Sequence, residues 1–240
     1  MSWQHLTFVT CLMVVMVAMA WILGRRNKQK DIAEKNKVLM AAAIAIDALE
    51  LFKIVIFCIR SQDPWAWRNE LPLFLCSIQL ITIPLAAFSK GRVKNAALDF
   101  VFIFGILGAV LGTYGAGNNY GSYPVLSIDN VNSGLTHSIS GFSSLYIAFS
   151  GMESMKRRNF PVVCGILTGF CIMATMANHL LDYNYMFLVR GDGTPYDILY
   201  NLVNGHPVWY PLAVIGLFFV YIGMFYGVYA MVKKAHLHRK

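Results

Sequence analysis

The sequence predicts an all-α membrane protein, a bundle of seven transmembrane helices with the N-terminus outside and the C-terminus in the cytoplasm. Its composition is 57% hydrophobic and its mean hydropathy is +0.54, values that are unusual for a soluble domain of this length. Seven apolar stretches are each about as long as the ~20 residues that a helix needs to cross a bilayer. In chain order they cover residues 6–23, 38–59, 71–88, 96–115, 133–151, 160–181 and 208–232. They use most of the 240 residues, so we expect one transmembrane domain over 1–240.

The orientation follows from the cations. Of the twenty Lys and Arg residues, sixteen lie in the first, third and fifth connections and in the tail. The opposite connections hold only Arg60, Arg68 and Arg190. The positive-inside bias therefore places the C-terminal tail in the cytoplasm. Contact with anionic lipid on that side also explains the net charge of +8, and we expect no nucleic-acid partner.

The first apolar stretch has a second interpretation, a cleavable signal peptide ending near Ala18-Met19-Ala20. A secretory signal carries its positive charges before the apolar run. Here no cation precedes the run and a dense cluster follows it. We therefore favour a retained first span.

The second stretch carries Asp47, Glu50 and Lys53, which recur every third residue and share one helix face. Charged groups are costly in hydrocarbon, so this face must point into the bundle. Glu50 and Lys53 have the spacing of an ion pair. A purely structural pair and a role in a site are both open.

The third and fifth stretches bring a thiol and an imidazole to one depth. If both helices enter from outside, near Leu71 and Asn132, then Cys76 and His137 each lie about five residues below the outer end. A histidine can take the proton of a thiol and create a reactive thiolate. Packing of the cysteine and a helix-to-helix hydrogen bond by the histidine are the structural alternatives.

Other polar residues are expected at the same level. Gln79 follows Cys76 by one helical turn. The outer end of the sixth stretch adds Asn178, His179, Asn184 and Tyr185. In the fourth stretch Gly105, Gly108 and Gly112 let neighbouring helices approach closely, which is a packing role.

The five cysteines, Cys11, Cys58, Cys76, Cys164 and Cys171, fit no metal-ligand spacing, and we expect neither a metal nor a cofactor. Cys58 and Cys76 both lie near the predicted outer surface, where a disulfide between them would be an alternative to a free catalytic thiol.

Residues 71–76, Leu-Pro-Leu-Phe-Leu-Cys, resemble the Leu-Pro-Leu-x-Leu-Cys signature that opens the third span of the bacterial YwaF-like integral membrane proteins. His137 falls where that family carries a histidine. Residues 184–188, Pro195 and residues 207–211 look like its Asn-Tyr-Met-x-Leu…Pro…Trp-Pro-Trp-Tyr stretch. Two departures are Phe74, where many members have a histidine, and Pro-Val-Trp-Tyr in place of a doubled tryptophan.

That family is similar to eukaryotic transmembrane protein 164, an acyltransferase that moves a fatty acyl group between phospholipids with a cysteine and a histidine. The resemblance implies these roles for Cys76 and His137 and membrane phospholipids as partners. The hypothesis is a multi-pass enzyme of the cell membrane that forms a Cys76 thioester at a site near the outer leaflet. Lys53, Gln79 or Asn178 would donate to the oxyanion, and Glu50 would orient Lys53.

Two alternatives use the same residues. A seven-helix transporter or sensor would relay protons through Asp47, Glu50 and Lys53 and have no covalent chemistry. The lack of inverted-repeat symmetry disfavours a transporter. A lipid hydrolase would use the same thiol and imidazole. The sequence indicates neither the acyl donor and acceptor nor the oligomeric state.

Overall fold

The computed structural model describes residues 1–237, and for Asn118, Asn119, His236 and Leu237 it describes the backbone only. All regular elements in this part of the chain are helices, as expected for the all-α class. The chain divides into two compact units, Met1–Ser154 and a second that begins at Met155. Arg239 and Lys240 of the predicted cytoplasmic tail lie outside the described residues.

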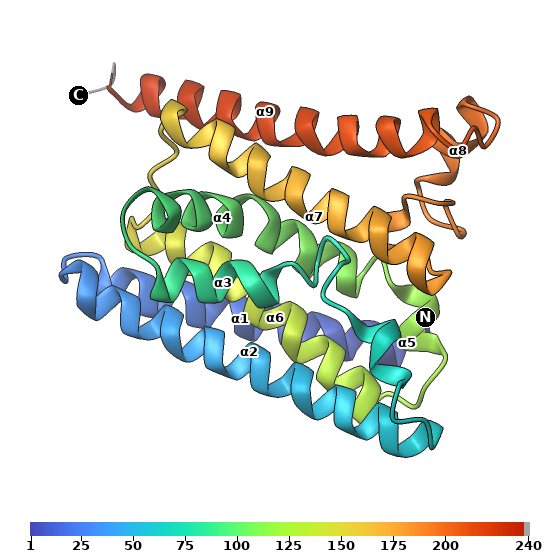
Figure 1. The fold of residues 1–240 in the computed structure, drawn as a ribbon. Helices are drawn as coiled ribbons and strands as arrows, with labels where there is room; N and C mark the ends of the chain where they lie inside the picture. The colour runs from blue at the N-terminus through green and yellow to red at the C-terminus, as the bar shows by residue number, and fades with distance from the viewer. Residues whose placement is uncertain (238–240) are drawn as a thin grey trace. The chain divides into compact units, whose positions relative to one another are not determined.

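The first unit is a helical bundle centred on α6 (Figure 1). Its elements are α1 (Trp3–Asn27), α2 (Ile32–Ser61), η1 (Ala66–Glu70), α3 (Gln79–Phe88), α4 (Gly91–Thr113), α5 (Gly117–Gly121) and α6 (Ile128–Ser150). Helix α6 packs against α1, α2 and α4, and α3 lies between α2 and α4. Residues brought to the middle of this bundle can therefore come from helices far apart in the sequence.

Short polar side chains set where these helices begin. Ser2, Asp31 and Ser127 each accept a hydrogen bond from a backbone N–H of the first turn, at the starts of α1, α2 and α6. This capping satisfies donors that have no partner within the helix. Helices α2 and α6 end on left-handed residues, Gln62 and Gly151, which turn the chain away from the helix axis.

The third apolar stretch is helical only in its second half. Leu71 is extended (φ −61°, ψ 144°) because the ring of the following Pro72 disfavours the helical conformation before it. Turns follow through Ile78, and α3 begins at Gln79. The expectation of a helix from residue 71 is therefore wrong in this half. The fifth helix differs in the other direction, since α6 begins five residues before the expected 133.

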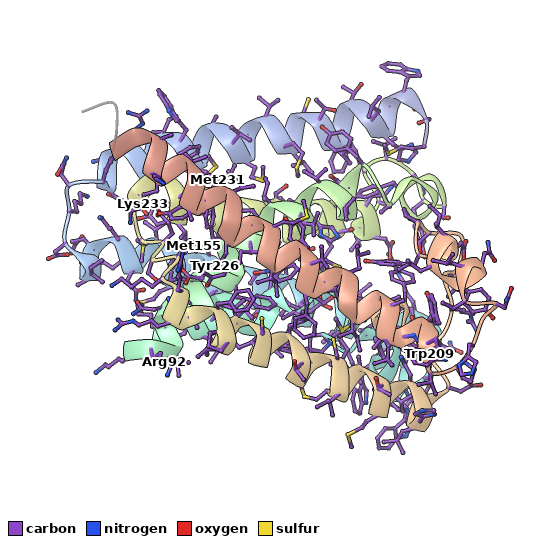
Figure 2. The ribbon with its side chains drawn as sticks, turned by 90° about the horizontal axis from the view of Figure 1, so that it is seen from above. Arg92, Met155, Trp209, Tyr226, Met231 and Lys233 are labelled. Carbon is purple, nitrogen blue, oxygen red and sulfur yellow. The ribbon has the colours of Figure 1, made fainter. Side chains whose placement is uncertain are left out.

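The second unit consists of η2 (Arg157–Asn159), α7 (Phe160–Leu181), η3 (Tyr185–Phe187), α8 (Asp197–Leu202) and α9 (Trp209–Leu237). Helices α7 and α9 run side by side (Figure 1), and the Phe160 and Tyr226 rings meet edge to face, with centroids 5.4 Å apart. Trp209 and Lys233 mark opposite ends of α9 (Figure 2). An aromatic ring at one end and a cation at the other is typical of a membrane-spanning helix.

Four helices are long and apolar enough to cross a membrane: α1, α4, the α7 segment (Arg157–Leu181) and α9. The protein is therefore a helical membrane protein. The remaining expected spans correspond to α2, α3 and α6. Helix α2 carries charges within its apolar stretch, α3 has only ten residues, and α6 is rich in serine and asparagine.

Candidate functional site

A cavity of about 100 Å³ lies in the first unit. Its lining comes from α2, from α3 and the turn before it, and from α6. The lining residues are Ile46, Glu50, Lys53, Cys76, Ser77, Leu80, Asn132, Ser133, Thr136 and His137. Four residues singled out in the sequence, Glu50, Lys53, Cys76 and His137, thus meet at one cavity.

Cys76 lies in the turn ahead of α3 rather than within a helix. The turn is closed by backbone hydrogen bonds from Ile78 N–H to the Phe74 carbonyl (3.0 Å) and from Gln79 N–H to the Cys76 carbonyl (3.3 Å). The Cys76 Sγ lies 4.0 Å from the Ser77 hydroxyl.

His137 is nine residues into α6 and lies against the backbone of α4 at Gly112. A Cβ on Gly112 would be 2.2 Å from the imidazole Cε1 and 2.4 Å from Nδ1. Only a glycine leaves room for the ring there. In the part of the chain that the structure describes, neither ring nitrogen of His137 has a hydrogen-bond partner, so one is free to accept a proton.

Helix α4 contacts both Cys76 and His137. The position where Gly108 would carry a Cβ is 3.5 Å from the Cys76 Cα and 3.6 Å from its Cβ. Gly108 and Gly112 are one turn apart, so their Cβ directions are roughly 5–6 Å from each other on one face. The Cys76 turn and the His137 ring therefore lie on consecutive turns of the same glycine face.

Lys53 is held by two carboxylates. Its Nζ is 2.7 Å from the Glu50 Oε1 and 2.8 Å from the Glu70 Oε2. The first pair was expected from the spacing on α2. The second was missed, although Glu70 immediately precedes the Leu-Pro-Leu motif. Glu70 ends η1, so this ion pair fixes the segment leading to Cys76 onto α2.

Gln79 is fully buried but does not line the cavity. Its Oε1 accepts a hydrogen bond from the Thr82 hydroxyl at 3.1 Å, and its Nε2 has no partner among the described residues. Asn132, which the sequence interpretation passed over, has a similar unpartnered atom, Oδ1, and does line the cavity. A buried amide without a full set of partners could have been suspected from an asparagine inside a membrane helix.

The remaining predicted support residues, Asn178, His179, Asn184 and Tyr185, belong to the second unit and do not line the cavity. Asn178 is occupied locally: its Oδ1 accepts from the Tyr185 N–H at 2.6 Å and its Nδ2 donates to the Tyr185 carbonyl at 3.1 Å. His179 is exposed.

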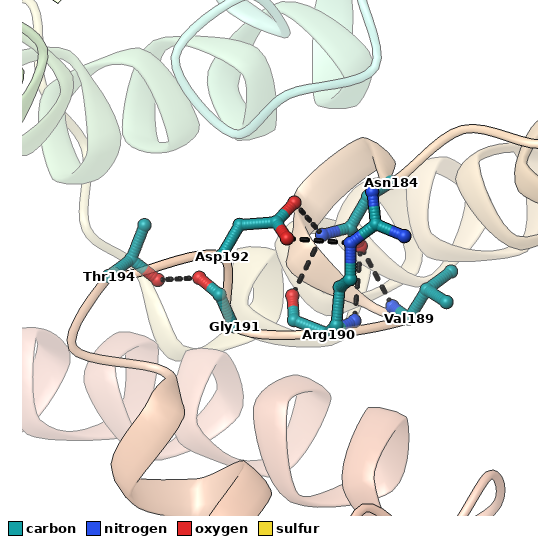
Figure 3. Close-up of polar contacts among 6 residues, drawn as sticks. All are labelled: Asn184, Val189, Arg190, Gly191, Asp192 and Thr194. Atoms are coloured by element: carbon teal, nitrogen blue, oxygen red, sulfur yellow. Dashed lines mark hydrogen bonds and ion pairs between the residues drawn. The ribbon is translucent and has the colours of Figure 1, made fainter.

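Asn184 organises the loop after α7 (Figure 3). Its Nδ2 donates to the Arg190 carbonyl and to Asp192, both at 2.8 Å, and its Oδ1 accepts from the Val189 N–H at 2.9 Å. The hydrogen bond from Asn184, with a smaller contribution from Arg190, lowers the pKa of the Asp192 carboxyl. These contacts account for Asn184 as a loop-stabilising residue.

All five cysteines are free thiols, including Cys58 and Cys76. Within residues 1–237 no group of three or more His, Cys, Asp or Glu side chains has the arrangement of a metal site. The residues that line the cavity include a thiol, an imidazole, a lysine–glutamate pair and two serines and a threonine.

A comparison with protein families matches residues 1–229, nearly the whole chain, to the TMEM164 family. The chain belongs to the TMEM164 family. No curated protein matches the chain, and no solved structure matches it. The family match extends the predicted resemblance through the first span. The bacterial YwaF-like label is narrower than this finding and stays a prediction.

Proposed function

We propose that this member of the TMEM164 family is a membrane-embedded acyltransferase that moves a fatty acyl group from a phospholipid, through a Cys76 thioester, to a lipid or other acceptor. The observation that carries the proposal is the meeting of Cys76 and His137 at one cavity and on one glycine face of α4. A thiol and an imidazole with a free ring nitrogen, both lining one cavity, are the side chains that nucleophilic catalysis needs.

In the first half-reaction His137 takes the proton of Cys76, and the thiolate attacks the ester carbonyl carbon of a phospholipid. The carbon–oxygen ester bond breaks, the His137 proton passes to the leaving oxygen, and a lysophospholipid departs. In the second half His137 takes the proton of the acceptor, whose oxygen or nitrogen attacks the thioester. The carbon–sulfur bond breaks and the proton returns to the thiol, so no cofactor is consumed.

Lys53 is the charged donor at the cavity. Its ammonium has three N–H donors, and two of them point to the Glu50 and Glu70 carboxylates. The third is available to the oxyanion that forms when the carbonyl is attacked, where such a donor contributes most. Gln79 does not line the cavity and takes no step in this proposal. The proposal gives no step to four predicted support residues of the second unit, Asn178, His179, Asn184 and Tyr185. Three of them, Asn178, Asn184 and Tyr185, form hydrogen bonds within or to the segment that follows α7.

The proposal also includes the topology. The chain crosses the cell membrane seven times, through α1, α2, α3 with its preceding turn, α4, α6, α7 and α9. The N-terminus is outside and the cationic tail is cytoplasmic. Cys76 precedes α3 and Lys53 is in the second half of α2, so this orientation opens the site toward the outer leaflet.

The test is acyl labelling. The purified protein is incubated with phospholipid that carries an alkyne-tagged acyl chain, and label on the protein is measured before and after hydroxylamine. We expect a hydroxylamine-sensitive label that Cys76→Ala abolishes and that His137→Ala slows by about 10²–10⁴, the usual contribution of a positioned general base.

Cys164→Ala and Cys171→Ala are the matched controls, since these cysteines belong to the second unit, and should keep the label. A label that survives Cys76→Ala would remove the thioester mechanism and favour a transporter or sensor. A label that is unchanged in His137→Ala would keep the thiol as nucleophile and discard the base.

A further inference from the structure

Asn132 lines the cavity but takes no part in the proposed transfer. Asn132 is only 3% exposed, and its Nδ2 donates a hydrogen bond to the Leu49 carbonyl of α2 at 2.8 Å. A carbonyl oxygen can only accept, so this contact fixes which end of the amide carries the nitrogen. The other end, Oδ1, is therefore a hydrogen-bond acceptor, and it has no partner among the described residues.

Two acceptors of different kinds thus line the same cavity, Asn132 and the His137 ring. A buried acceptor without a donor destabilises the protein by about 1–3 kcal/mol, so a ligand that supplies a hydrogen is favoured there. A lipid hydroxyl has one hydrogen and can satisfy only one of the two acceptors. A water molecule has two hydrogens and can satisfy both at once.

The cavity is large enough for such a water. Its volume of about 100 Å³ is well above the roughly 10–15 Å³ that one water requires by the same measure. The lining also includes the polar residues Ser133 and Thr136. Polar walls and two to four partners are what an ordered buried water needs.

We propose that Asn132 and His137 together bind the water that hydrolyses the Cys76 thioester, so that the protein has a second activity, release of free fatty acid from phospholipid. The inference rests on the proposed acyl-enzyme. Water donates one hydrogen to Asn132 Oδ1 and loses the other to His137 as its oxygen attacks the thioester carbonyl. The carbon–sulfur bond breaks, the fatty acid leaves, and the proton returns to the sulfur.

The experiment follows three products from tagged phospholipid in ¹⁸O-water: the Cys76 acyl label, the free fatty acid, and the acylated product of an added lysophospholipid. Without lysophospholipid, the natural chain should release fatty acid that carries one ¹⁸O. Asn132→Ala should lower that release by about tenfold, the effect of losing one hydrogen bond. The Cys76 label should then accumulate, and transfer to lysophospholipid should change by less than about threefold.

Asn130→Ala is the matched control. Asn130 is on the same helix and is equally buried, at 3%, but it binds the carbonyls of Tyr120, Tyr123 and Pro124 and does not line the cavity. Its substitution should leave the ratio of hydrolysis to transfer unchanged. If Asn132→Ala fails to fold, the natural chain still tests the proposal, because added lysophospholipid should divert acyl groups from ¹⁸O-labelled fatty acid to the acylated product.

The outcomes separate the two proposals. Acyl label and transfer without any ¹⁸O-labelled fatty acid would overturn hydrolysis and leave the acyltransferase intact. Equal loss of hydrolysis and transfer in Asn132→Ala, with the label retained, would make Asn132 a general support of the site and remove its role in selecting water. Absence of any Cys76 label in the natural chain would overturn both.

Discussion

The His137 ring has no hydrogen-bond partner among the described residues, so its position depends on packing. A close packing constraint is Gly112 of α4. Gly112→Ala would put a methyl group 2.2–2.5 Å from three ring atoms, so the ring must turn away. Alanine is favoured over glycine within a helix by about 0.5–1 kcal/mol. We therefore expect Gly112→Ala to keep or raise thermal stability while acyl labelling of Cys76 falls by up to about 10², the effect of a misplaced catalytic group.

Gly169→Ala is the control for this prediction. Gly169 is inside α7, and a Cβ there would meet nothing within 4 Å. This variant should label at the natural rate. Normal labelling by Gly112→Ala would mean that the ring position matters little and would argue against His137 as the base.

At the scale of elements, the ion pair between Lys53 and Glu70 connects α2 with η1, six residues before the nucleophile. Both side chains are partly exposed, 32% and 26%, so the pair contributes only about 0–1 kcal/mol to stability. Loss of this ion pair should affect catalysis more than stability, because the pair helps to position the turn that carries Cys76. We expect Glu70→Gln to slow acyl labelling several-fold while the thermal midpoint shifts by no more than the few degrees that such an energy produces.

Glu34→Gln serves as the matched control, because Glu34 forms an ion pair with Lys37 on α2 but does not line the cavity. It should label normally. A Glu70→Gln variant that labels at the natural rate would show that the turn before α3 is positioned without η1.

The start of α3 differs from the start that hydropathy alone predicted. The apolar stretch 71–88 has the length of a span, but Pro72 extends the residue before it and the helix begins only at Gln79. The predicted depth of Cys76 assumed a helical rise of about 1.5 Å per residue from Leu71. The structure has no helix between Leu71 and Ile78, so that depth was wrongly derived. Cys76 and His137 nevertheless line one cavity in the structure, and their catalytic pairing stays a prediction.

For the whole molecule, the charge distribution makes a topological prediction. A fluorescent or enzymatic reporter fused after Lys240 should report the cytoplasm, and one fused before Met1 should report the exterior, because cationic connections remain on the cytoplasmic side. The two fusions control each other, since an odd number of spans requires opposite readings. A C-terminal reporter that reads the exterior would mean that the number of crossings is wrong.

The sequence by itself determined the helical membrane class, the resemblance to the family of transmembrane protein 164, and the pairing of Glu50 with Lys53. These features follow from local composition and from spacing along one helix, which are visible in the chain. Only the tertiary structure decided that Glu70 pairs with Lys53, that Gly112 makes room for the His137 ring, and that the Asn132 side-chain oxygen is buried without a partner among the described residues. Each of these depends on which helix faces pack together, and packing between residues far apart in the chain leaves no periodic signal in a single sequence.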